Sequence, residues 1–233
     1  MSTPATRERR LLADELLSVG PDAPTLCDGW TARDLAAHVV IRERRPDAAT
    51  GILVGALSGY TDKVQAKTAG GDWGGLVDHV RTGPPRWSPT RIDKLDRAVN
   101  TIEFFVHLED VRRAVDGWTP RDVDADLADD LAAALRRGTK MLTRSAPTGV
   151  TLAADDLEPF VAHAGEPMVT VRGPIGELVL FVYGRQAHAL VEFDGPDDAI
   201  AELRRAKFGI WPDRPPDRAA GIAACVRPQG LEP

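Results

Sequence analysis

Apolar residues recur with helical spacing through the first ~145 positions, and glycine or proline breaks separate the segments. Leucines follow this spacing over residues 7–19, and a Gly-Pro pair at 20–21 ends the segment. Thr31 begins a second segment, and Asp34 follows three residues later in a variant of the capping box. The spacing predicts further helices over residues 48–66, 76–80, 90–115 and 121–143. The first 145 residues are therefore expected to form a helical bundle.

The pattern changes after residues 145–149, a small and turn-rich stretch. Short β-like runs cover residues 150–153 and 168–172, and alternation extends over 188–193. The apolar run 175–183 fits either a strand or a helix by pattern alone. A helix is predicted over 197–208, followed by a Pro- and Arg-rich tail from Pro212. We predict two domains, a helical one over 1–146 and a smaller α/β domain over 147–233, and therefore an α+β fold class.

Two polar residues interrupt an apolar row within the predicted helix 90–115. The row of residues four apart contains apolar side chains except at Glu103 and His107. A buried carboxylate or imidazolium needs a partner, because an unpaired buried charge is costly. Glu103 and His107 could satisfy each other as an ordinary core pair, or both could bind a metal ion.

His38 adds a third candidate ligand from a separate helix, where it lies on the same face as Leu35 and Val39. Together, His38, Glu103 and His107 would supply three nitrogen or oxygen ligands. That number leaves a fourth position open on tetrahedral zinc, as in catalytic sites. Nickel, iron and manganese also accept such ligands. The alternative is that the histidines are hydrogen-bonded core residues.

Other polar residues near these positions have two possible roles. Asp34 could orient His38 or cap the helix, and Asp110 has the same ambiguity beside His107. His79 lies in a Gly-rich segment and could approach an open site or simply be exposed. His163 and His188 fall in the second half and are predicted to be structural or exposed.

Composition narrows the class of protein. The 233 residues are 43% hydrophobic, and the net charge is -6 with a pI near 5.4. An acidic chain without basic clusters argues against nucleic acid as the main partner. No apolar run approaches the ~20 residues of a membrane span. Cys27 and Cys225 are far apart, which favours a reducing cytoplasm over a disulfide framework.

Several enzyme motifs are missing from the sequence. It contains no G-x-S-x-G elbow, no G-x-x-x-x-G-K-[ST] phosphate loop and no H-E-x-x-H pair. Residues 70–75 are Gly-rich but do not link a clear strand to a helix. A reactive thiol at Cys27 is conceivable, although most isolated cysteines behave as small buried hydrophobes.

The stretch from Gly29 to His38 reads G-W-T-A-R-D-L-A-A-H. It resembles the G-W-T-x-R-D-L-x-x-H signature of the mycothiol-dependent maleylpyruvate isomerase N-terminal domain, a DinB-like metal-binding helical bundle. The resemblance implies a four-helix bundle over the first ~145 residues and an actinobacterial source. It also implies that His38, Glu103 and His107 are the metal ligands.

The second half is similar to the small sterol-carrier-like α/β domain of that family. The similarity is carried by residues 171–178 and by the Gly184-Arg185 pair. It implies that residues 175–183 form a helix closed by Gly184. Arg185 becomes a candidate catalytic residue that binds an acidic substrate or the thiol, since guanidinium binds carboxylates in a two-pronged way. Its other reading is an arginine that closes a helix end.

The resemblance also implies thiol chemistry with mycothiol as co-substrate. A divalent metal, zinc by expectation, would lower the pKa of a bound thiol, and the thiolate would attack a small electrophile. The result would be an isomerisation or an S-transfer. Two alternatives stay open: a non-catalytic metal-binding module of the same fold, and a helical bundle whose histidines only fill the core.

Overall fold

The structure is a computed structural model of the chain, and it describes residues 2–45, 58–85, 88, 93–155 and 157–209. Six helices and their connecting loops form the described N-terminal part. Their bounds are α1 Pro4–Val19, α2 Ala32–Arg44, α4 Ser58–Ala69, α5 Trp73–Thr82, α6 Asp93–Arg112 and α7 Ala125–Leu142.

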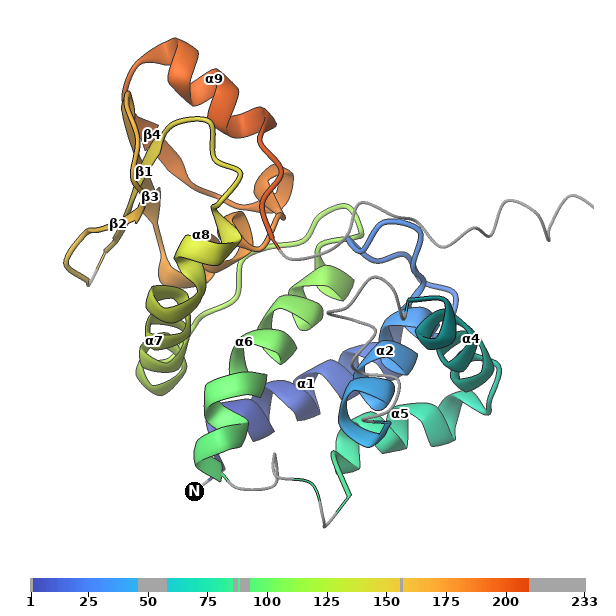
Figure 1. Cartoon of the computed structure of the whole chain (residues 1–233). Coiled ribbons are helices and arrows are strands. Elements are labelled where there is room, and N and C mark those ends of the chain that lie inside the picture. Colours follow the sequence, from blue (N-terminus) through green and yellow to red (C-terminus); the bar gives the residue numbers. More distant parts are fainter. Residues whose placement is uncertain (1, 46–57, 86–87, 89–92, 156, 210–233) are drawn as a thin grey trace, which may run out of the picture.

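A four-stranded sheet with short helices forms the C-terminal part, at one end of the molecule (Figure 1). Its elements are β1 Gly149–Ala154, β2 Phe160–His163, β3 Met168–Gly173, α8 Ile175–Val182, the 3-10 helix η3 Gln186–His188, β4 Glu192–Asp194 and α9 Asp197–Arg205. The strand order is β2-β1-β3-β4, in which β1 and β3 are parallel and the two outer pairs antiparallel. The predicted α+β class is confirmed.

The predicted elements match most of these bounds. The undecided run 175–183 is the helix α8, as the resemblance implied. Of the predicted helix 48–66, residues 58–66 belong to α4, and residues 48–57 lie outside the described residues. The strand predicted over 188–193 is wrong in its first four residues, because His188 ends a 3-10 helix and pairing with β3 begins only at Glu192. The tail from Pro212 also lies outside the described residues.

Helix ends follow from local side chains. The Thr3 hydroxyl accepts a hydrogen bond from the Thr6 backbone N–H at the start of α1, and Pro4 occupies the first turn. At the start of α2 the Asp34 carboxylate accepts hydrogen bonds from the Thr31 backbone N–H at 3.1 Å and hydroxyl at 2.7 Å. The predicted capping role of Asp34 is thus confirmed.

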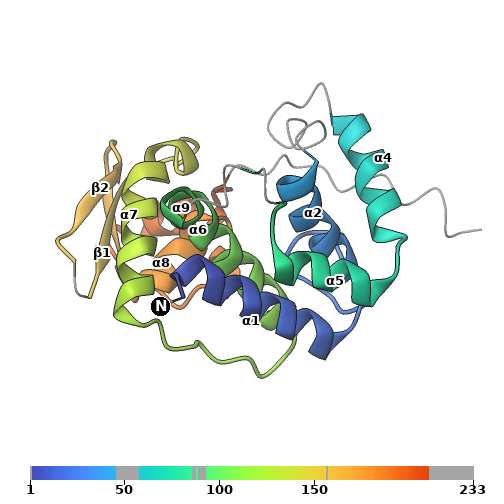
Figure 2. The same cartoon turned by 90° about the horizontal axis from the view of Figure 1, so that it is seen from below.

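Two hydrophobic cores hold the described chain together. The first joins α1, α2, α5 and the inner face of α6, with Leu12, Leu35 and Phe104 fully buried. The second joins the other face of α6 and all of α7 to α8 and the sheet, around Phe105 and Phe181. Figure 2 shows α1 running beneath α6, and α7 lying between the helices and the sheet. The predicted domain division at residue 146 stays a prediction.

No helix among the described residues has the length and apolar character that a bilayer crossing requires.

Candidate metal centre

Three of the predicted site residues come together between α2 and α6. One side-chain nitrogen of His38, one of His107 and a carboxylate oxygen of Glu103 all lie within 4.8 Å of one another. His38 and His107 are buried, and the Glu103 side chain is 20% exposed. The two imidazole rings meet edge to face, with centroids 5.4 Å apart. The structure therefore places the predicted ligand set around one common point.

The distances from the Glu103 donor atom to the two histidine nitrogens match those between the ligands of a metal ion. Glu103 Oε1 lies 3.5 Å from His38 Nε2 and 3.3 Å from His107 Nε2. Both distances exceed a normal N–H···O hydrogen bond, whose length is about 2.7–3.2 Å. Ligand atoms about 2.0–2.1 Å from a tetrahedral zinc ion are separated by about 3.3–3.4 Å, the edge of the tetrahedron. The two separations from Glu103 thus fit a shared four-coordinate cation better than they fit direct hydrogen bonds.

The loop before α2 and the first turn of α2 set the position of His38. Gly29 has a positive φ of 74°, which a residue with a side chain rarely adopts, and it turns the chain into the helix. The Trp30 ring then packs against His38, with centroids 5.1 Å apart. Arg33 donates hydrogen bonds to the carbonyls of Ala69 and Gly71 and so ties α2 to the end of α4. The G-W-T-x-R-D segment therefore holds the helix that carries His38.

A chain of contacts orients His107 from behind. Its Nδ1 lies 2.9 Å from Asp110 Oδ2, which leaves Nε2 facing Glu103. Arg185 then donates to both oxygens of Asp110, at 2.7 and 2.6 Å. Such a carboxylate behind an imidazole fixes its ring orientation and raises its basicity as a ligand. Of the two roles predicted for Asp110, the geometry favours the orienting one.

The turn after α8 places Arg185 beside Asp110. Gly184 has a positive φ of 86°, and a Cβ there would lie 2.7 Å from the Phe208 carbonyl oxygen, so glycine is needed. The Arg185 backbone N–H then bonds the Leu180 carbonyl and closes the helix. The side chain is buried and also donates to the Tyr183 carbonyl at 2.6 Å. Arg185 therefore both closes the helix end, as one reading predicted, and reaches the ligand cluster through Asp110.

The charges of this cluster shift its pKa values in opposite directions. Burial favours the neutral form of His107, but hydrogen bonds to Asp110 and Cys27 and the charge of Glu103 raise its pKa well above the ordinary value. Burial and the neighbouring His107 lower the pKa of His38, despite a contribution from Glu103. Burial raises the pKa of Asp110, yet Arg185 and His107 lower it overall. The raised pKa means that His107 is protonated when no metal is bound. Binding of a cation to His107 would therefore release the proton of its imidazolium.

A second cluster, formed by Cys27, His107 and Asp110, also has its donor atoms within 4.8 Å of one another. Cys27 Sγ lies 3.2 Å from Asp110 Oδ2 and 3.5 Å from Arg185 Nη2. The Arg185 guanidinium already binds both Asp110 oxygens, and its positive charge opposes a metal ion there. Burial, together with Asp110, raises the pKa of the Cys27 thiol, so it stays protonated at neutral pH. Without a bound metal, the protonated Cys27 is poorly suited to act as a nucleophile.

Sequence reasoning missed two residues near the cluster. Arg42 lies one turn after His38, and its Nε is 3.5 Å from Glu103 Oε1. Burial raises the pKa of the Glu103 carboxyl, whereas the charge of Arg42 lowers it. The resulting pKa is well below the ordinary value. Burial and the charge of Glu103 raise the pKa of Tyr183 to about 12. The i, i+4 spacing from His38 could have drawn attention to Arg42, whereas no local pattern signals Tyr183.

The remaining histidines lie apart from the cluster. His79 is exposed on α5, and half-buried His163 pairs with Val150 in the sheet. The His188 carbonyl accepts a hydrogen bond from Arg113 at 2.6 Å. Trp73 begins α5 and its ring stacks under the Arg33 guanidinium, while Trp87 lies outside the described residues.

The chain is similar to known proteins in structure. No protein-family model and no curated protein matches the chain. Two solved structures do, those of the mycothiol-dependent maleylpyruvate isomerase and of its histidine-to-alanine mutant. Each has a TM-score of 0.50 and covers 82% of this chain and 90% of its own, with 19% and 18% sequence identity respectively. At this identity the similarity shows that the chain shares the fold of that isomerase.

Proposed function

We propose that this protein is a metal-dependent enzyme that uses a small thiol to attack an electrophilic substrate. His38, Glu103 and His107 are the proposed metal ligands, with zinc as the metal and mycothiol as the thiol. The observation that carries the proposal is the approach of these three donor atoms to within 4.8 Å of one another. The shared fold with a mycothiol-dependent isomerase supports the choice of thiol.

The chain's own residues would prepare this chemistry. A divalent cation held by three protein ligands has a position left for the thiol sulfur and lowers its pKa, so that thiolate is present at neutral pH. Asp110 holds the His107 ring with Nε2 toward Glu103, and Arg185 holds Asp110. Trp30 and the buried helix faces keep water from the imidazoles. We assign Arg185 to positioning Asp110, and direct contact between Arg185 and substrate stays a prediction.

The reaction would use the thiolate in one of two ways. In an isomerisation, the thiolate adds to a conjugated double bond, the former double bond rotates, and the thiolate leaves with its electron pair. In an S-transfer, the thiolate forms a bond to carbon while a leaving group departs with the electron pair of the broken bond. Both begin with the same thiolate, so the ligand set does not distinguish them.

Metal content and thiol dependence test the proposal together. Purified protein should hold about one divalent ion per chain, and His38→Ala and His107→Ala should lose it. His79→Ala, which changes an exposed histidine outside the cluster, is the matched control and should keep the ion. In the cobalt-substituted protein, mycothiol should then alter the visible spectrum, and loss of a model electrophile such as maleylpyruvate or an epoxide should require the thiol.

The outcomes separate the alternatives left by the sequence. A protein that binds metal but whose cobalt spectrum does not respond to mycothiol would be a non-catalytic metal-binding module. A protein without stoichiometric metal, or one whose two histidine variants keep the metal, would contradict the proposed site.

A further inference from the structure

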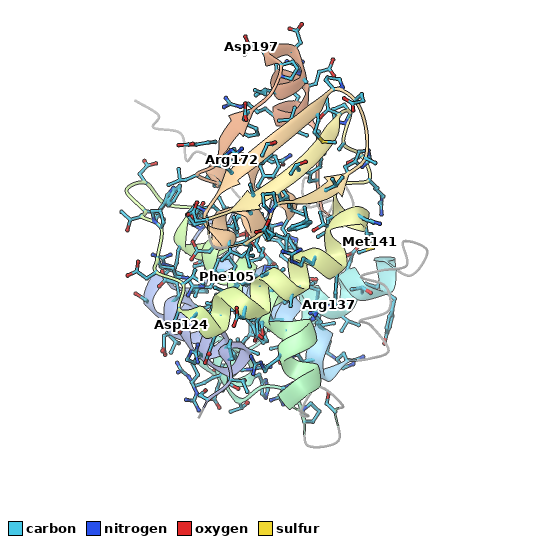
Figure 3. All side chains as sticks on the ribbon, turned by 90° about the vertical axis from the view of Figure 1, so that its left-hand side faces the viewer. Phe105, Asp124, Arg137, Met141, Arg172 and Asp197 are labelled. Carbon is cyan, nitrogen blue, oxygen red and sulfur yellow. The ribbon has the colours of Figure 1, made fainter. Side chains whose placement is uncertain are left out.

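A concave site lies where α6 and α7 meet the C-terminal part of the chain. It is a cavity of about 530 Å³, within the range of about 300–1,000 Å³ typical of small-molecule sites. Phe105 of α6 forms part of its wall, and in Figure 3 this residue lies beside α7 where the helices meet the sheet. Further apolar walls come from Val123, Leu157, Ile175 and Leu190. A ligand here would contact both parts of the fold.

The cavity is separate from the metal centre. Phe105 and Glu109 line it, and each follows a proposed metal ligand, Glu103 or His107, by two positions. Residues two apart on an α-helix are separated by a rotation of about 200° around the helix axis, so their side chains point to nearly opposite sides. The cavity and the ligand cluster therefore occupy opposite sides of α6.

The charged floor of the cavity is already neutralised by its own ion pairs. Arg113 donates to Glu109 at 2.5 Å and to both oxygens of Glu177 at 2.7 and 2.9 Å. Arg121 donates to Glu109 at 2.8 Å and to Glu8. Neither guanidinium is therefore positioned to attract an anionic ligand.

The rim of the cavity carries negative charge. Asp122, Asp129 and Asp155 line the cavity and are exposed, and none of them forms a hydrogen bond or ion pair with another residue that the structure describes. Altogether five carboxylates line the cavity against two guanidinium groups. An apolar interior below a net negative rim favours a ligand with the opposite charge on an apolar body.

We propose that this cavity binds a small amphiphilic amine, with the apolar body against Phe105, Val123 and Ile175 and the ammonium group at the aspartate rim. Charge complementarity selects the cation, and the volume limits it to a small molecule. This site does not depend on the metal centre or on the proposed thiol chemistry.

Three indole probes of the same shape but different charge test the proposal. Tryptamine is a cation, tryptophol is its neutral analogue and indole-3-propionate is an anion. Calorimetry or ligand-observed NMR with the full chain should give tryptamine the tightest binding and indole-3-propionate the weakest. We expect a preference for tryptamine over tryptophol of about tenfold at low salt, from several exposed ion pairs of modest strength. The preference should shrink in about 0.5 M salt, where the screening length falls to a few ångströms.

Variants locate the binding site. The triple change Asp122→Asn, Asp129→Asn and Asp155→Asn should remove the tryptamine preference and leave tryptophol binding unchanged. The control alters three exposed aspartates elsewhere, Asp22→Asn, Asp62→Asn and Asp78→Asn, so the net charge changes equally.

A cavity-narrowing variant tests the apolar body of the ligand. Ala128→Leu places a larger side chain on the α7 wall and should weaken tryptamine and tryptophol alike. Thermal melts of both variants verify folding, and the aspartate triple changes only exposed side chains.

Several results would overturn the proposal. One is equal affinity for tryptamine and tryptophol at low salt, or no binding by any probe up to its solubility limit. Another is a tryptamine preference that survives the rim triple but is lost in the control triple. Self-association of the chain that the rim triple abolishes would assign the cavity to a second copy and also reject a small amine.

Discussion

The two sides of α6 both bury charged side chains, yet they do so differently. On one side, Glu103 stands 3.3 and 3.5 Å from the His107 and His38 nitrogens, longer than direct hydrogen bonds. On the other side, fully buried Glu109 binds Arg113 at 2.5 Å and Arg121 at 2.8 Å. Arg113 and Arg121 therefore complete the charge balance around Glu109 within the protein. Glu103, in contrast, lies at 3.3–3.5 Å from His107, His38 and Arg42, without a comparably short ion pair among the described residues.

This difference shows that a buried polar stripe in a sequence does not by itself mark a functional site. Guanidinium groups with five fixed donors saturate carboxylates and build a closed network between the helices and α8. Imidazoles present single nitrogens that can all point to one atom in common. We therefore expect mutations on the network side to change folding stability and mutations on the imidazole side to change metal affinity.

The largest expected effect is on the network side. Arg113→Met would leave the Glu109 and Glu177 carboxylates buried without their shared partner, and should lower the free energy of unfolding by about 3–5 kcal/mol. Arg112→Met is the matched control, since Arg112 also binds Glu109 but is 24% exposed. Its loss should be about 0–1 kcal/mol, because solvent partly screens Arg112 and because Glu109 keeps Arg113 and Arg121 as partners. Equal losses in urea titrations would contradict the distinction between the buried Arg113 and the partly exposed Arg112.

Metal binding should stabilise the imidazole side. Zinc at 100 times its dissociation constant should raise the free energy of unfolding by about 2.7 kcal/mol, because it binds the folded chain only. His38→Ala should abolish this increase, and His163→Ala, in β2, should retain it. An identical melting temperature with and without zinc would contradict metal binding on the imidazole side of α6.

Neighbouring carboxylates on α6 offer a sharper test. Asp110→Asn should weaken metal binding about 10–100-fold, the usual effect of losing a carboxylate behind a histidine ligand. Glu109→Gln, one residue away and equally buried, should cost stability but leave metal affinity unchanged. Competition with a zinc-sensitive chelator dye measures both affinities, and equal affinity changes would show that Asp110 has no special role.

The smallest expected effect concerns Asp34. Asp34→Ala removes the carboxylate that bonds Thr31 and should cost about 1 kcal/mol through loss of the cap. Metal affinity should stay within twofold of the parent, since capping is the role that the structure confirms for Asp34. A tenfold weaker affinity would instead support the predicted link between Asp34 and His38.

Local patterns predicted most of the helices because each depends on neighbours a few residues apart. The helix over 175–183 was ambiguous by periodicity, since α8 is buried on every side and has no polar face to reveal its period. The strand predicted over 188–193 was wrong over 188–191, because the 3-10 helix ends at His188 and residues 189–191 do not pair with β3. The missed strand β2 is short and its alternation is weak.

Helical periodicity alone indicates which donor groups are available, namely two imidazoles and a carboxylate on inward helix faces. The α+β class also follows from the sequence, because helical and strand periods occupy separate stretches. The packing of α2 against α6, in contrast, is what brings His38 and Glu103, 65 positions apart in the chain, to a common point with His107. Only tertiary packing joins Arg185 to Asp110 and opens a cavity behind α6, since distances between packed elements are set by side chains remote in sequence.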